Sequence, residues 1–453
     1  FELTFGVLGD KFGHRKLVFG GSLVVIVGSL VCTASPTIEW MWVGSAINGL
    51  GAGAIFPASL ALVASVSRTP QARVRGIAIW AGMLSAGSAL SPLLGGMFAE
   101  IGWWRGAYAV VALVSLFAAA LTLSRAAESE PQPRRKLDLW GQITFAPGLI
   151  LMLFGLVQGP EDGWTASHVV TALVVGAALL VAFVVIELRV SSPLLELKLF
   201  RIRQFTVSSV VAVVGMFAFL GACFSTSMWL GPVQHQAPIY TGLLFLLLQG
   251  PAFVLIPVIP RLQARLGSRT LLTVGFAAMA VGALLAATND VNNSSVSAFV
   301  LPSLLVGIGF ALTLSPMTAT AVNSVPRHLM GTASAMTNLL RDLGFALGPV
   351  LVGAIALSAA GNKLAASLQS SGLPVDQLGP AMGIAEAGGP IAVNSLPPEV
   401  PGAAAQPFAL EALGSGFAQA FVVVAVAALV AALLSWFGLR GTRDEDERVQ
   451  LSP

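Results

Sequence analysis

Charged residues are scarce in this chain of 453 amino acids, where Asp, Glu, Lys and Arg together account for only 10% of the residues. A soluble domain of ordinary composition carries about 25% charged residues. Hydrophobic residues make up 56% of the chain, so most of the surface must face lipid. This balance excludes a water-soluble enzyme, a nucleic-acid-binding module and a disordered scaffold. The formal net charge of +3 is too small to indicate a polyanion-binding patch.

Cysteine and histidine are also rare, which removes further classes of protein. The two cysteines, Cys32 and Cys223, lie in apolar runs, so we expect neither a disulfide framework nor a cysteine metal site. The four histidines are scattered and never stand at the spacing of metal ligands. The sequence also lacks the Gly-x-x-x-x-Gly-Lys-Ser/Thr loop of an ATP-driven pump and the clustered His, Asp and Glu of a membrane-bound enzyme. We therefore expect neither an enzyme nor a cofactor.

Long charge-free windows are what the sequence has instead. A transmembrane helix needs about 20 apolar residues. The window 204–260 is interrupted between Gly231 and Pro238 and predicts two spans, and the window 343–362 is extended backward to about Gly331. We therefore predict twelve complete spans, preceded by a partial one at the N-terminus. The charge-free windows are 17–38, 40–67, 76–99, 106–124, 139–160, 163–186, 204–260, 270–289, 291–326, 343–362 and 412–439.

The basic residues support this count. With the loops assigned alternately to two sides, one side receives every Lys and Arg except Arg105, Lys363 and Arg341. Membrane proteins keep Lys and Arg on the cytoplasmic side. We therefore predict a multi-pass protein of the plasma membrane, with both ends of this chain in the cytoplasm. Arg is far commoner than Lys, and Ala and Gly are abundant, a composition typical of a GC-rich bacterial genome.

An internal repeat divides the chain into two halves. The segment Gly6–Val18 recurs as Pro260–Leu272, with two Leu residues, one Gly and one Arg matching at an offset of 254 residues. Two similarly oriented halves are a known transporter layout. Two further matches, at offsets of 258 and 257 residues, pair Gly49–Gly51 with Gly307–Gly309 and Gly87–Gly96 with Gly344–Gly353.

The repeat also predicts what lies between and before the halves. If each half holds six spans, two extra spans lie between them, and roughly 50 residues are missing before Phe1, one span and most of another. The intact protein should then have fourteen spans, and the chain as given should not transport. The predicted divisions are an incomplete N-terminal bundle (1–124), a cytoplasmic linker (125–138), two extra helices (139–186), a second linker (187–203), a C-terminal bundle (204–439) and a cytoplasmic tail (440–453).

One external segment of the C-terminal bundle, residues 357–413, is rich in Gly, Pro and Ala and has few charges. This composition predicts a mostly irregular loop with room for one short surface helix. A tolerated insertion is the favoured interpretation, and a substrate-binding lid is the alternative.

The segment from Gly6 to Lys16, with the pattern Gly-x-Leu-x-Asp-x-x-Gly-x-Arg-Lys, resembles the signature loop of the major facilitator superfamily. The fourteen-span layout resembles its drug:proton antiporter-2 branch, as do Leu137–Gly141, Leu199–Arg201 and Gly331–Gly344. The resemblance implies an all-α polytopic membrane fold with two six-helix bundles and two extra helices. It also implies a monomeric, proton-coupled secondary transporter that exports small lipophilic or amphiphilic compounds, antibiotics among them. An exporter of a specific metabolite with different coupling is the alternative.

The resemblance assigns a conformational latch to the signature loop. In such transporters the loop aspartate, here Asp10, pairs with nearby basic groups and a helix N-terminus, which physically favour a carboxylate. Arg73 and Arg75 on the next cytoplasmic loop are its expected partners. For the two basic residues of the loop itself, a role in the latch and simple positive-inside anchoring remain equally open. The predicted latch residues are Gly6, Asp10, Gly13, Arg15, Lys16, Arg73 and Arg75.

The fifth-helix antiporter motif, usually Gly-Pro-x-x-Gly-Gly, is Ser91-Pro92-Leu-Leu-Gly95-Gly96 in this chain. Pro92 predicts a kink, and the glycines allow a neighbour to pack closely; a kinked packing helix without a gating role is the alternative. In the fourth helix Ser45 stands where the family has an arginine, and Asn48 is the remaining polar group.

The remaining polar candidates lie within the span that starts near Gly331. Arg341 and Asp342 fall about ten residues into it, and buried charges at such depth usually face the interior of a bundle and pair. Arg341 and Asn338 match family positions, whereas Asp342 stands where an uncharged polar residue is usual. Asp342 is therefore a candidate for proton coupling; a static buried charge network is the alternative.

Overall fold

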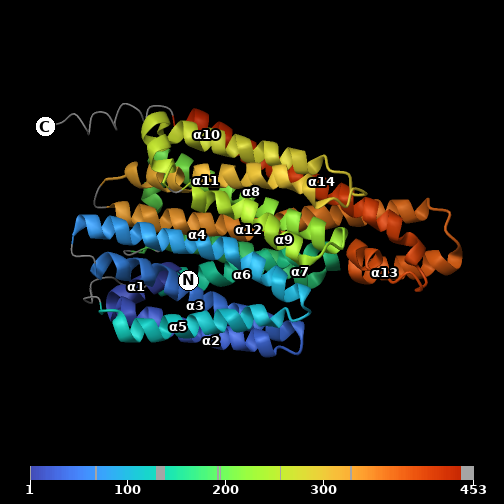
Figure 1. Ribbon diagram of the computed structural model, residues 1–453, viewed down its shortest axis with the longest axis horizontal. Helices are drawn as coiled ribbons and strands as arrows, with labels where there is room; N and C mark the ends of the chain where they lie inside the picture. Colours follow the sequence, from blue (N-terminus) through green and yellow to red (C-terminus); the bar gives the residue numbers. More distant parts are fainter. Residues whose placement is uncertain are drawn as a thin grey trace. The chain divides into compact units, whose positions relative to one another are not determined.

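The computed structural model describes residues 2–66, 69–128, 138–190, 193, 195–255, 257–326 and 329–439. These residues are helical almost throughout, and none of them is assigned to a strand (Figure 1). The prediction of an all-α protein is confirmed.

The first half of the chain forms five helices, and two more follow. These are α1 (Glu2–Phe12), α2 (His14–Ala34), α3 (Ile38–Val66), α4 (Pro70–Glu100), α5 (Arg105–Arg125), α6 (Leu139–Asp162) and α7 (Ser167–Glu187). The second half contains the short turns η1 (Leu197–Arg201), η2 (Trp229–Val233), η3 (Val296–Phe299) and η5 (Ala403–Ala405). Its long helices are α8 (Arg203–Met228), α9 (Pro238–Val254), α10 (Ile259–Ala287), α11 (Val300–Asn323), α12 (Met330–Gln369), α13 (Val375–Asn394) and α14 (Gln406–Gly438).

Each of the twelve predicted spans corresponds to a helix. Within the described residues, eleven helical segments are long and apolar enough to cross a membrane, and α9 is an apolar helix of 17 residues. The window 204–260 divides after α8, as its Gly and Pro content predicts, and α12 begins one residue before the predicted start at Gly331. Apolar side chains such as Leu113, Val114 and Phe117 of α5 are more than half exposed. Exposed apolar side chains on a long helix fit a lipid-facing surface.

The chain divides into two compact units. The first consists of Phe1–Gly148 and Leu179–Glu196, and the second of Leu149–Ala178 and Leu197–Pro453. The division passes through α6 and α7, so each unit holds one end of this helix pair. The position of residues 139–186 outside both bundles stays a prediction.

The internal repeat is also a repeat of packing. In the first unit α2 packs on α3 and α5, and in the second α10 packs on α11 and α14. A Cβ on Gly51 would lie 2.8 Å from the carbonyl oxygen of Gly21, and a Cβ on the matching Gly309 would lie 2.4 Å from that of Gly275. Both crossings therefore bring helix backbones together at the same matched glycines, as small-residue packing between membrane helices requires.

The third match of the repeat differs between the units. In the second unit Gly344 and Gly348 of α12 lie against α8, where added Cβ atoms would stand 2.4 Å from the Val213 carbonyl oxygen and 2.8 Å from that of Phe217. The matching Gly87 of α4 has nothing within 4 Å of the position that a Cβ would take. Gly344 therefore allows α12 to approach α8 closely, whereas the matching Gly87 makes no such close contact in the first unit.

The prediction of a mostly irregular loop over 357–413 is wrong. α12 continues to Gln369, α13 fills most of the middle, and α14 begins at Gln406 (Figure 1). Pro380 lies within α13, and Gly389, whose φ is +66°, marks a kink in it. Neither residue prevents the segment from being largely helical. The segment also buries apolar residues of its own, and this packing stabilises helices that the Gly and Pro content disfavours. Its buried cluster consists of Leu364, Leu368, Ala381, Val393, Ala405, Ala409 and Ala412.

Candidate functional site

The turn between α1 and α2 is built on Gly13. Its φ of +101° and ψ of +136° lie in a region that side-chain-bearing residues rarely adopt. A Cβ at this position would also stand 2.4 Å from Oε1 of Glu128. The backbone conformation therefore favours glycine where the chain enters α2, and a Cβ there would displace the Glu128 carboxylate.

Arg15 and Glu128 join the start of α2 to the end of α5. The Arg15 side chain donates to the carbonyl oxygens of Thr122, at 3.3 Å, and Leu123, at 2.8 Å. The backbone N–H of Arg15 donates to Glu128 Oε1 at 3.0 Å. A cation at a helix C-terminus and a carboxylate at a helix N-terminus are both favoured by the helix dipole. Arg15 therefore joins two helices of the first unit, a contact that positive-inside anchoring alone does not require.

The second unit repeats half of this arrangement. Gly267 matches Gly13 and interrupts α10 with φ +77° and ψ +155°. Arg269 matches Arg15, and its Nε donates to the Trp436 carbonyl oxygen at 2.8 Å. Its guanidinium carbon lies 3.9 Å from the centroid of the Trp436 ring. In each unit, the arginine of the repeat therefore donates to backbone carbonyl oxygens at the C-terminal end of a later helix, α5 in the first unit and α14 in the second.

Asp10 lies in the last turn of α1, where its Oδ1 is 3.3 Å from Nε2 of His14. At the N-terminus of α2, which the resemblance predicts to face the aspartate, the backbone N–H of Arg15 donates to Glu128. Gly6 has nothing within 4 Å of its Cβ position, and Lys16 is exposed. The side chains of the predicted partners Arg73 and Arg75 lie outside the described part of the chain.

Two partners of the signature loop were missed by sequence reasoning. His14 follows Asp10 at the i,i+4 spacing that places side chains on one helix face, so this signal was readable. Glu128 is an acidic residue in a mostly basic linker, and nothing local connects it with Arg15, 113 residues earlier. The folded packing of α2 against α5 makes this second pair.

The fifth-helix motif lies within α4, which continues through Pro92 to Glu100. Ser91 is exposed, Gly96 is buried, and Gly95 has nothing within 4 Å of its Cβ position. Pro92 therefore does not end the helix, and the matching Pro349 is likewise inside α12.

Asn48 belongs to the contact between α2 and α3. Its Oδ1 accepts a hydrogen bond from Ser29 Oγ at 3.1 Å, and its Nδ2 lies 3.9 Å from Cys32 Sγ. These polar groups stand beside a close backbone approach, because a Cβ on Gly28 would lie 2.8 Å from the Gly44 carbonyl oxygen. Asn48 is therefore used in helix packing. Ser45, on the same helix, is exposed.

The polar group of α12 lies deep in a long span. Arg341 is eleven residues from Met330, about 17 Å along the axis at helical rise. Its Nη1 donates to Asn338 Oδ1 at 3.2 Å, one turn earlier on the same helix. Both Arg341 and Asp342 are half-buried.

The sequence model of the Major Facilitator Superfamily matches residues 1–349. The chain belongs to the major facilitator superfamily. The turn at Gly13, its copy at Gly267 and the two arginines that follow them therefore belong to a chain of this superfamily.

Curated relatives carry names from drug resistance. Multidrug resistance protein Stp of Mycobacterium tuberculosis (strain CDC 1551 / Oshkosh) is 29% identical over 356 residues, which cover 78% of this chain and 66% of Stp. The match thus spans just under two thirds of that relative. The tetracenomycin C resistance and export protein of Streptomyces glaucescens is 27% identical over 452 residues, 98% of this chain and 82% of that protein.

Solved structures agree on the fold. An auto-inhibited POT family peptide transporter superposes with a TM-score of 0.59 at 17% identity, covering 98% of this chain and 87% of the other. The human organic anion transporter MFSD10 gives a TM-score of 0.52 at 16% identity, covering 94% and 80%. At such low identity these likenesses show the fold alone.

Proposed function

We propose that the protein containing this chain is a secondary active transporter that exports small lipophilic or amphiphilic drugs across the bacterial plasma membrane. The observation that carries the proposal is the family match together with relatives named for drug resistance, one of which, the tetracenomycin C exporter, aligns over 98% of the chain. The drug:proton antiporter branch of the superfamily is the assignment that these names favour.

In this proposal the proton gradient supplies the energy. Arg341 and Asp342 are the candidates for coupling, because charges about 17 Å into a span are costly unless they have a function or a partner. The contact of Arg341 with Asn338 supports a polar interior at this level of α12. Asn48 is a weaker candidate, since its amide is hydrogen-bonded within the α2–α3 contact.

The signature loop is proposed to stabilise one end state of the transport cycle. Asp10 contacts His14 at the end of α1, and Arg15 and Glu128 join α2 to α5. These interactions make the loop a rigid corner, so movement of α1 and α2 would be transmitted to α5. We further propose that the protein acts as a monomer without a cofactor and that both ends of this chain are cytoplasmic.

An exporter of a specific metabolite with other coupling is the second candidate. It is favoured by Ser45 and Ser91, which stand where the drug antiporter motifs have an arginine and a glycine. The two candidates differ in their response to loss of the proton gradient and in their range of cargo.

The deciding experiment measures accumulation of several unrelated drugs in energised cells that express the full-length protein, with and without a protonophore. The proposal expects reduced accumulation of more than one drug, restored to the control level by the protonophore. Cells that carry the empty expression vector serve as the control. Export of a single compound, or export that survives the protonophore, would favour the second candidate.

A further inference from the structure

The second unit has a polar corner where α8 ends and α9 begins. The chain turns there through the π-helical residues Trp229–Val233. His235 follows in the left-handed region, with φ +51°, which is uncommon for a residue other than glycine. Asn394, the last residue of α13, donates from Nδ2 to the carbonyl oxygens of Pro232, at 3.1 Å, and Val233, at 3.0 Å. The end of α13 is thus fixed to the corner.

Asn394 is the centre of this junction. It is 6% exposed, and its carbonyl oxygen lies 3.2 Å from His235 Nε2 and accepts from Gln406 Nε2 at 3.4 Å. Gln406, the first residue of α14, also donates to the carbonyl oxygen of Leu396. Side-chain amides and an imidazole therefore hydrogen-bond three helix ends to one another, and this network fixes the groups that surround the neighbouring space.

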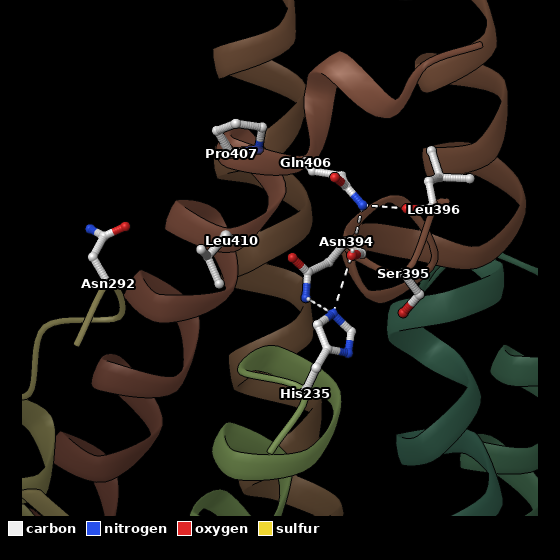
Figure 2. Close-up of a pocket in the computed structure, with 8 residues that line it drawn as sticks. All are labelled: His235, Asn292, Asn394, Ser395, Leu396, Gln406, Pro407 and Leu410. Carbon is white, nitrogen blue, oxygen red and sulfur yellow. Dashed lines mark hydrogen bonds between the residues drawn. The ribbon is translucent and has the colours of Figure 1, made fainter. Parts of the chain in front are cut away.

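A pocket opens beside the junction, lined by the residues drawn in Figure 2. Its volume is about 660 Å³. His235, Ser395 and Gln406 supply hydrogen-bonding groups to its lining, and Leu396 and Leu410 supply apolar surface. The volume lies in the range of small-molecule sites, which combine apolar walls with a few placed polar groups.

The chemistry of the lining defines the class of ligand. Among the described residues that line the pocket there is no Asp, Glu, Lys or Arg, and His235 is the one that can ionise. A charged ligand would therefore lose its hydration without gaining a counter-ion. A neutral molecule with an apolar ring and hydroxyl or amide groups would satisfy both kinds of surface.

We propose that this pocket is a binding site for a neutral amphiphile, held between the end of α13 and the α8–α9 corner. The inference rests on the proposed export of amphiphilic compounds and adds to it a subsite within the second unit. A ligand in this pocket contacts both α13 and α14. Its binding and release therefore depend on the position of α13, which lies within the segment 357–413.

Site-directed labelling tests the pocket directly. Ser395 lines it, whereas Ser370 does not; both are exposed, both follow a helix, and both donate from Oγ to a carbonyl one turn earlier. Ser395→Cys and Ser370→Cys are therefore a matched pair. The two cysteines of this chain, Cys32 and Cys223, are buried and should label slowly, and the unsubstituted full-length protein measures the background. The full-length protein in liposomes is treated with a water-soluble maleimide, with and without chloramphenicol as the neutral amphiphilic probe.

At ten times its dissociation constant, chloramphenicol should slow labelling of Ser395→Cys about tenfold, since the free fraction falls to roughly a tenth. Labelling of Ser370→Cys should not change. Equal rates at position 395 with and without the probe would overturn the proposal. Protection of the same position by the cation ethidium would overturn the restriction to neutral ligands.

A second pair of variants distinguishes binding of chloramphenicol in the pocket from a conformational change caused by binding elsewhere. Ser395→Trp fills the pocket, and Ser370→Trp adds the same bulk outside it. Equilibrium dialysis should show at least about tenfold weaker chloramphenicol binding to the first variant only, which corresponds to about 1.4 kcal/mol; equal binding refutes the site. Neither assay needs a proton gradient, so protection without cellular efflux would leave the pocket standing while the proposed function fails.

Discussion

Replacing Gly13 with alanine, alongside a matched control, separates two contributions to the free energy of unfolding. One is the backbone conformation of the turn, and the other is the hydrogen bond that Glu128 accepts at the start of α2. The backbone of Gly13, at φ +101° and ψ +136°, is unfavourable for alanine by about 1–3 kcal/mol. Gly267→Ala is the matched control, because its backbone, at φ +77° and ψ +155°, lies in the same region that disfavours alanine and its Cβ position has nothing within 4 Å.

The two variants differ in one contact. The new Cβ at position 13 would stand 2.4 Å from Glu128 Oε1, so the carboxylate must move away and give up its hydrogen bond to the Arg15 N–H. Loss of a side-chain cap at a helix N-terminus costs about 0.5–2 kcal/mol. Gly13→Ala should therefore lower the free energy of unfolding by about 0.5–2 kcal/mol more than Gly267→Ala does.

The assay is unfolding of the purified full-length protein in mixed micelles with increasing sodium dodecyl sulfate. In a Glu128→Ala background the hydrogen bond is already lost, so the penalty for Gly13→Ala should fall to that of Gly267→Ala. This non-additivity identifies the contact. If Gly13→Ala costs the same in both backgrounds, the carboxylate at the start of α2 contributes nothing, and the reasoning is refuted.

Three further predictions concern charge. Asp10→Asn should lower the rate of drug efflux at unchanged membrane abundance, because the contact with His14 weakens; a normal rate would remove Asp10 from the cycle. Asp342→Asn and Arg341→Ala should lower efflux and alter its dependence on pH, and an unchanged rate and pH profile would leave this pair structural. A hydrogen bond from His168, and then one from Gln158, lower the pKa of Asp162 from its ordinary value near 3.8. Because the pKa of Asp162 is lower in the folded state, its ionised carboxylate stabilises the fold fully at pH values above 3.8. This contribution is lost as the pH falls through the folded-state pKa. The difference in apparent Tm between the wild type and Asp162→Asn should therefore shrink in strongly acidic buffer, and a constant difference would contradict this.

The helices were predictable because their signals are local. A run of about 20 apolar residues predicts a span wherever it occurs, and the break between Gly231 and Pro238 correctly separated α8 from α9. The repeat, which can also be read directly from the sequence, identified Gly51 and Gly309 as matched positions before their shared packing was known.

The errors and omissions involve contacts between distant residues. The interaction of Glu128 with the start of α2 depends on the packing of α5, which no local pattern reports. The segment 357–413 was predicted to be irregular from its glycines and prolines, yet it buries Leu364, Leu368 and Val393 together and is largely helical. Its junction through Asn394 joins residues about 160 positions apart. The site roles of Asp10, Arg341 and Asp342 stay predictions.

The glycine crossings set a practical order for altering cargo preference by mutagenesis. Gly21 with Gly51, and Gly275 with Gly309, bring backbone against backbone, so any side chain added there would push two helices apart whatever the cargo is. A library should therefore hold these four positions fixed in both halves. The library should vary exposed positions of the same helices, such as Ser45 on α3, where space is available for a new side chain. A change in selectivity at such a position can then be measured while the helix packing stays intact.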